Sequence, residues 1–85
     1  MPMFLIEWVD SSSSSGWTEI KPLRERSKVD QITSVGFLFK DDADSVTLLQ
    51  SHTNRDDAND DLGDQTICIP KVAVKRQVSL TEAPP

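Results

Sequence analysis

Cys68 and His52 are the only cysteine and the only histidine of the chain, so they are the one pair that could supply a thiolate nucleophile and its base. Cys68 lies between Ile67 and Ile69 in a segment with strand character, where a cysteine usually behaves as a small apolar residue. A single cysteine also excludes an internal disulfide and a zinc site made of several cysteines. These residues predict neither a catalytic pair nor a metal centre.

The stretch 41–64 is a second candidate for chemistry, because it contains eight aspartates and a single arginine. An EF-hand loop that starts at Asp57 would find oxygen ligands at Asn59 and Asp61, but its glycine position holds Leu62 and its final glutamate position holds cysteine. These aspartates have no apolar neighbours that would raise a carboxyl pKa for acid–base catalysis. The sequence predicts solvated loops, with weak binding of a divalent ion as the alternative.

Charge is unevenly distributed along the 85 residues, which have 14 acidic and 9 basic side chains and a net charge of −5. A net negative charge argues against binding to a phosphate backbone. Most of the acidity is confined to the stretch 41–64, however, and two basic segments stand apart from it at 21–28 and 71–76. Either segment could form a modest positive face.

The length predicts one domain, which we place at residues 1–82 with a frayed tail at 83–85. The N-terminus has no basic leader, and no window approaches the roughly 20 apolar residues that a membrane span needs. Together with the single cysteine, these features predict a cytoplasmic protein without a membrane partner. A chain of 9.5 kDa has little core to spare, so contacts with further copies of itself are expected.

Alternation of apolar and polar residues predicts β-strands, and turn-forming residues separate them. The expected strands span residues 3–9, 29–40, 46–51, 66–69 and 72–80. A run of serines at 11–15 followed by Gly16 predicts a loop. Trp17, Ile20 and Leu23 recur every three residues and predict a short helix that ends near Arg26, although Pro22 weakens it.

Gly36 lies in the middle of the clearest strand, whose two faces comprise residues 33, 35, 37 and 39 and residues 32, 34, 36 and 38. Glycine contributes no packing there, so its expected role is to let the strand bend sharply or to let another backbone come close. An aspartate-rich turn at 41–44 then leads into the next strand as a hairpin. The pattern predicts a mainly β fold, a small twisted barrel of about five strands.

The stretch 35–48, a strand with a central glycine that runs through an aspartate-bearing turn into the next strand, resembles the first motif of Sm-like (LSm) proteins. Residues 67–71, Ile-Cys-Ile-Pro-Lys, followed by Val74 and Val78, resemble the second motif. The two motifs stand in the family's order and cover about half of the chain. The opening residues 6–10 and the Ile-Pro-Lys segment are also similar to small phage-encoded proteins.

This resemblance implies a strongly bent five-stranded barrel of the SH3-like or Sm-like type with a short N-terminal helix. Sm-like proteins assemble into rings by pairing the fourth strand of one copy with the fifth strand of the next. Residues 65–69 and 76–80 would be the edges that join, and each would supply backbone donors and acceptors that are costly to leave unpaired.

In the family the ring binds single-stranded RNA through an asparagine of the first motif and an Arg-Gly pair of the second. Here Ser45 stands in the asparagine position, Ala43 stands where a base would stack, and Pro70-Lys71 replaces Arg-Gly. Alanine cannot stack on a base and this pair lacks the arginine fork, so weak RNA binding is expected. Its candidate residues are Lys71 as a phosphate contact, Ser45 as a hydrogen-bonding group, Lys75 and Arg76.

The sequence therefore indicates a non-enzymatic protein that needs neither cofactor nor metal and forms a homo-oligomeric ring with weak affinity for single-stranded RNA. The alternative is a phage-encoded SH3-like module whose barrel binds a peptide or a host protein, forms no ring and does not bind nucleic acid.

Overall fold

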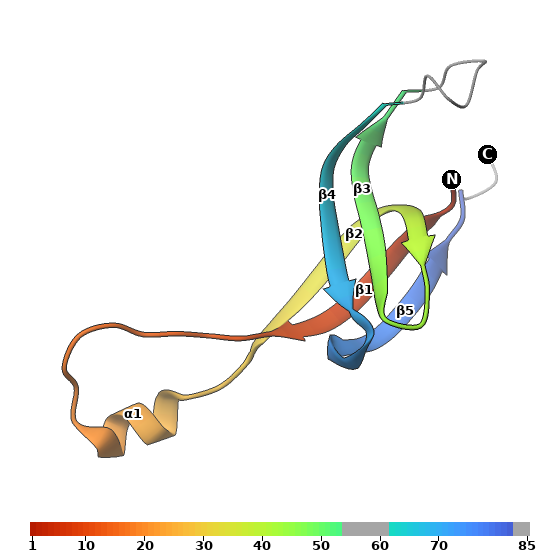
Figure 1. Ribbon diagram of the computed structural model, residues 1–85. Helices are drawn as coiled ribbons and strands as arrows, with labels where there is room; N and C mark the ends of the chain where they lie inside the picture. The colour runs from red at the N-terminus through yellow and green to blue at the C-terminus, as the bar shows by residue number, and fades with distance from the viewer. Residues whose placement is uncertain (54–61, 83–85) are drawn as a thin grey trace.

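Five antiparallel strands form one sheet in the computed structural model, which describes residues 1–53 and 62–82. The strand order is β4-β3-β2-β1-β5 (Figure 1). The elements are β1 (Met3–Asp10), α1 (Ile20–Arg26), β2 (Asp30–Asp41), β3 (Ser45–His52), β4 (Gly63–Pro70), the 3-10 helix η2 (Lys71–Ala73) and β5 (Val74–Leu80). The predicted mainly β fold with one short α-helix is confirmed, and the sheet is not closed, since β4 and β5 are its two edges.

The core lies on one face of the curved sheet. Ile6, Val46, Leu48 and Ile69 are completely or almost completely buried there, and they come from β1, β3 and β4. In β1 the alternate residues on either side of Ile6 also pack against this cluster, as the period of two in the sequence predicted. The opposite face of β1 is partly covered.

β2 directs its less apolar side toward the core. Leu38 packs against the buried cluster, whereas Val35 and Phe39 on the other side are 52% and 58% exposed. The pairing of β2 with β3 shifts by one residue between Leu38 and Lys40, which leaves Phe39 as the extra residue of a bulge. Alternation had revealed two faces for this strand, and only its neighbours decide which face is inward.

Gly36 is buried where β2 bends toward β3 (Figure 1). A Cβ atom at this position would lie 2.7 Å from the carbonyl oxygen of Leu49 and 3.1 Å from the Cβ of Leu48. Only glycine lets these two backbones approach so closely without a shift. The expected close approach at Gly36 is therefore confirmed.

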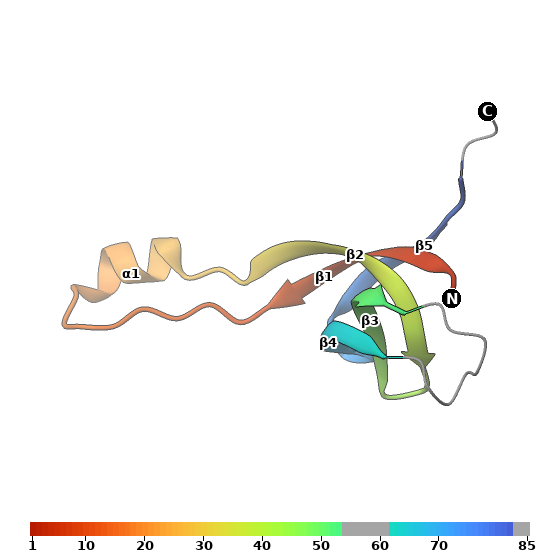
Figure 2. The ribbon, with the colours of Figure 1, turned by 90° about the horizontal axis from the view of Figure 1, so that it is seen from above.

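Residues 11–29 form an arm that projects away from the sheet (Figures 1 and 2). The molecule measures 58 × 29 × 27 Å along its principal axes, so the arm adds roughly one body width to its length. Helix α1 lies in the arm, and Pro22 is its third residue, where a missing N–H costs nothing because the first turn has no intrahelical acceptors. The predicted helix is confirmed, starting at Ile20, and it follows β1 rather than preceding the first strand.

Two expectations about the C-terminal third need comment. Val72 was predicted in a strand, but it lies in η2 and is 93% exposed, because the chain turns after Pro70 before β5 begins at Val74. The tail 83–85 lies outside the described residues. Within the described parts of the chain, no helix is long and apolar enough to cross a membrane.

Candidate binding surface at the β2–β3 turn and the sheet edges

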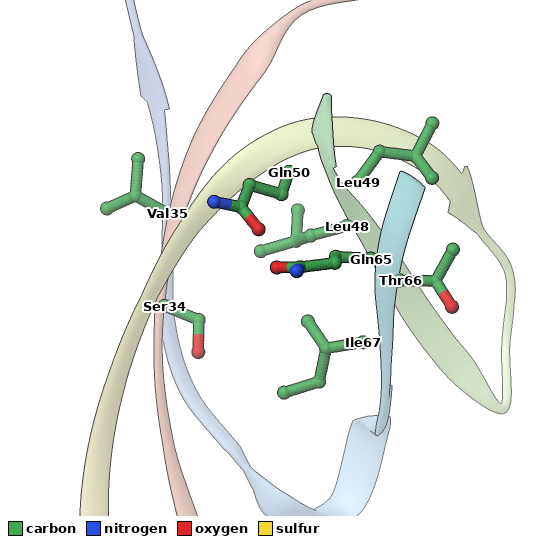
Figure 3. Close-up of a pocket in the computed structure, with 8 residues that line it drawn as sticks. All are labelled: Ser34, Val35, Leu48, Leu49, Gln50, Gln65, Thr66 and Ile67. Carbon is green, nitrogen blue, oxygen red and sulfur yellow. The ribbon is translucent and has the colours of Figure 1, made fainter. Parts of the chain in front are cut away.

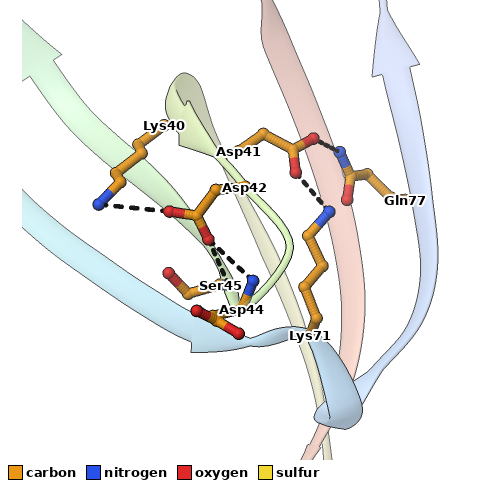
Figure 4. Close-up of polar contacts among 7 residues, drawn as sticks. All are labelled: Lys40, Asp41, Asp42, Asp44, Ser45, Lys71 and Gln77. Carbon is orange, nitrogen blue, oxygen red and sulfur yellow. Dashed lines mark hydrogen bonds and ion pairs between the residues drawn. The ribbon is translucent and has the colours of Figure 1, made fainter.

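The β2–β3 turn is organised by Asp42 (Figure 4). Its Oδ1 accepts hydrogen bonds from the backbone N–H groups of Asp44 and Ser45, both at 2.9 Å, and its own N–H donates to the carbonyl of Ser45 at 3.0 Å. These backbone donors, together with Lys40 at 3.3 Å from Oδ2, hold the pKa of Asp42 below its ordinary value. The turn is an Asx-type structure in which the carboxylate has a structural role.

Asp41 ties three elements together at the same end of the sheet (Figure 4). Its carboxylate forms an ion pair with Lys71 of η2 and accepts a hydrogen bond from Nε2 of Gln77 in β5 at 3.0 Å. Lys71, and then Gln77, lower the pKa of Asp41. The backbone N–H of Lys71 also donates to the carbonyl of Asp44 at 2.9 Å. Lys71 is thus held by the turn rather than left free in solution.

The structure brings together two of the four candidate RNA-binding residues. Ser45 pairs with Pro70 across β3 and β4, beside Lys71, so these two lie next to each other. Lys75 and Arg76 lie on β5, on the other edge strand. Nη1 of Arg76 is 3.8 Å from Oε1 of Glu7, whereas no ion pair involves Lys75 among the described residues.

The surroundings of Ser45 are acidic. Three aspartates of the turn face two lysines, Lys40 and Lys71, and both lysines are already paired with aspartates. A phosphate group that approached Ser45 would therefore have to compete with carboxylates for these cations. Of the four candidates, Lys75 is the cation with the least local competition.

Cys68 and His52 are not brought together. Cys68 lies opposite Thr47 in the β3–β4 pair, and His52 is five positions further along β3, about 16 Å away at the usual rise of a strand. The hydroxyl groups of Thr47 and Ser45 lower the pKa of the Cys68 thiol. The prediction of no catalytic pair stands for these residues. Cys68 is exposed rather than packed as a small apolar residue, because the alternation of β4 turns Ile69 inward instead.

A hollow runs beside the edge strand β4 (Figure 3). Leu48 and Ile67 form its apolar part, and it is open because no strand pairs with β4 on that side. Gln50 and Gln65 point their amide groups into it (Figure 3). Gln65 has a φ of 54°, an uncommon backbone conformation for a residue other than glycine. Sequence reasoning did not find this hollow, because its walls come from β2, β3 and β4.

No group of three or more metal-ligating side chains occurs within residues 1–53 and 62–82. The alternative ion site at Asp57, Asn59 and Asp61 lies outside the described residues. Comparisons of the chain with protein-family models, with curated proteins and with solved structures find no match.

Proposed function

We propose that this chain is a non-enzymatic Sm-like protein whose copies join edge to edge into a homo-oligomeric ring. The observation that carries the proposal is the position of β4 and β5 at the two ends of the sheet, each paired with one neighbour only. An edge strand presents a row of unpaired N–H and C=O groups that a second strand can pair with. The two edges have similar lengths, 8 and 7 residues, so one can cover the other.

Incomplete packing at the β4 edge supports the same proposal. Ile67 belongs to the residues packed against the core but remains half-buried, and Val35 across the hollow is 52% exposed. A strand added to β4 would cover the hollow between them. Burial of apolar surface stabilises by about 25 cal/mol per Å², so closing this side with a second copy is favourable.

Charge favours unlike edges as partners. β5 has the cations Lys75 and Arg76, whereas β4 has the anion Asp64 and no cation. Pairing β5 with a second β5 would bring like charges together, and pairing β4 with β5 would bring opposite charges together. A contact between two different surfaces is heterologous and closes into a ring when its rotation permits.

Light scattering on two blocked variants tests this proposal. Thr66→Lys places an exposed cation on β4, and Ser79→Lys does the same on β5, which discourages strand addition at one edge each. We expect the wild type to give a multiple of 9.5 kDa and each variant alone to give 9.5 kDa. A mixture of both should give twice 9.5 kDa, because one intact β4 edge and one intact β5 edge remain.

The control is Thr33→Lys, the same substitution at an exposed position of the inner strand β2, which should assemble like the wild type. A wild-type mass of 9.5 kDa at every concentration would overturn the ring. The chain would then be better described as an SH3-like module that binds a peptide along the open β4 edge.

Weak binding of single-stranded RNA is the second part of the proposal. Lys75 on β5 is its best-placed phosphate contact, since Lys71 and Arg76 are already near carboxylates. We expect filter retention of an oligonucleotide at low salt that declines as salt rises, and a further decline in Lys75→Ala. A failure to retain RNA at any salt concentration would remove this part and leave the ring intact.

A further inference from the structure

The arm at residues 11–29 has apolar side chains that the rest of the molecule does not cover. Trp17 is fully exposed, and Ile20 and Val29 are 68% and 59% exposed. Helix α1 contains no buried residue. Exposed apolar residues that are gathered on one projecting segment mark an interaction surface, whereas scattered ones need no explanation.

The charge of the arm is opposite to that of the remaining chain. The arm has four bases and two acids, a net charge of +2, whereas the other residues have five bases and twelve acids, a net charge of −7. None of the arm's cations takes part in an ion pair within the described residues. These cations are Lys21, Arg24, Arg26 and Lys28.

The arm extends toward the place that a second copy would occupy. In both views it projects beyond the side of the sheet on which β4 lies (Figures 1 and 2). Its reach is about one body width, from the axes of 58 and 29 Å. A copy paired with the β4 edge would therefore lie alongside the arm.

We propose that the arm docks on the acidic body of a neighbouring copy, with Trp17 and Ile20 as its apolar contacts and its cations as the complementary charges. This inference rests on the proposed edge-to-edge assembly and adds a second contact to it. Opposite net charges favour this partner over an anionic polymer, which the body of the molecule would repel. A tryptophan near the centre of such a contact is typically one of its strongest contributors.

Fluorescence of Trp17 tests the docking separately from the assembly. In a Trp8→Phe variant Trp17 is the only tryptophan, and acrylamide quenching reports how exposed it is. We expect quenching to fall at concentrations where light scattering gives a multiple of 9.5 kDa, and to rise again on dilution to single chains. If Trp8→Phe fails to fold, the difference between the wild type and Trp17→Phe gives the same reading.

Two substitutions of opposite sign on α1 test the charges. Arg24→Glu should raise the concentration of half-assembly, and Glu25→Lys should lower it, because damage to the helix would instead change both in the same direction. Trp17→Ala should raise that concentration about tenfold or more. All three effects of charge should shrink at high salt.

The outcomes separate the two proposals. Full quenching of Trp17 in a species of multiple mass overturns the docking and leaves the edge-to-edge ring in place. Tight, salt-sensitive quenching of Trp17 by a single-stranded oligonucleotide, with none on self-assembly, also overturns it in favour of a nucleic-acid partner. A mass of 9.5 kDa at every concentration overturns both proposals at once.

Discussion

The sheet completely buries side chains from three of its strands, such as Ile6 and Ile69, whereas in the arm at residues 11–29 only Leu23 is even partly buried. The sheet has cross-strand pairing and a core, and either would stabilise it without help. The arm has a helix of seven residues, well below the length of about 12–15 residues at which an isolated helix becomes stable in water. The difference teaches that the sheet can fold as a unit, while the arm depends on its attachment and on contacts with another molecule.

Two hydrogen bonds and one register position attach the arm to the sheet. Asp10 pairs with Asp30 at the ends of β1 and β2, and the Ser12 hydroxyl donates to the carbonyl of Lys28 just beyond that point. Within the arm, the Ser27 hydroxyl donates to the carbonyl of Leu23 at 2.7 Å. These contacts give the arm a direction but little buried apolar surface.

The largest effect should follow from truncating the core. Ile6→Ala removes a side chain with no exposed surface, and we expect a loss of about 2–5 kcal/mol in the free energy of unfolding. Ile20→Ala on the exposed side of α1 should change it by less than about 0.5 kcal/mol. Urea unfolding curves of both variants measure the contrast. Equal losses would mean that the arm belongs to the same cooperative unit as the sheet.

A smaller loss is expected from a methyl group at Gly36. Gly36→Ala would place the Cβ 2.7 Å from the carbonyl oxygen of Leu49, so the two strands must move apart at a cost of about 1–3 kcal/mol. Gly16→Ala in the arm meets no atom within 4 Å, and its strain at a φ of 88° should be confined to the arm. Denaturant midpoints measure both. An unchanged midpoint for Gly36→Ala would contradict the close approach of β2 and β3.

A modest pH dependence should arise from Asp41. Its pKa in the folded protein lies below the ordinary value of 3.8, so the folded state binds the proton less tightly than the unfolded state. Its contribution is thus fully present above 3.8 and is lost as the pH falls through the folded pKa. The melting temperatures of the wild type and Asp41→Asn should differ at neutral pH and converge in acid. A constant difference would show that Lys71 and Gln77 do not favour the ionised carboxylate.

The smallest effect on folding should come from removing the arm. Because Asp10 and Asp30 are paired, residues 11–29 can be replaced by Asn-Gly, a two-residue turn that suits an antiparallel hairpin. We expect the unfolding free energy of the single chain to stay within about 0.5 kcal/mol, while assembly weakens. A shortened chain that no longer folds would break the comparison drawn above.

Much of the secondary structure was predictable because it depends on neighbouring residues. The alternation around Ile6 predicted β1, the aspartates at 41–44 predicted the hairpin turn, and the spacing of Trp17, Ile20 and Leu23 predicted the helix. Val72 was misplaced for the same reason. Its spacing from Val74 matches a strand, but the turn after Pro70 takes it into η2.

The candidate surface was less predictable. Lys71 was singled out as a phosphate contact, but no local pattern indicates that its ammonium group pairs with Asp41, thirty positions earlier in the chain. The hollow beside β4 is likewise formed by segments that are distant in the sequence. Only the pairing of strands brings such residues together.

By itself, the sequence determined which segments form strands, where the chain turns and how charge is divided between the arm and the remainder, because these properties depend on residue type and on nearby neighbours. The tertiary structure decided that Leu38 rather than Phe39 faces the core, that β4 and β5 form the edges and that Lys71 is neutralised. Those outcomes depend on contacts between segments far apart in the chain, and a strand with two apolar faces can bury either one until its partners are in place.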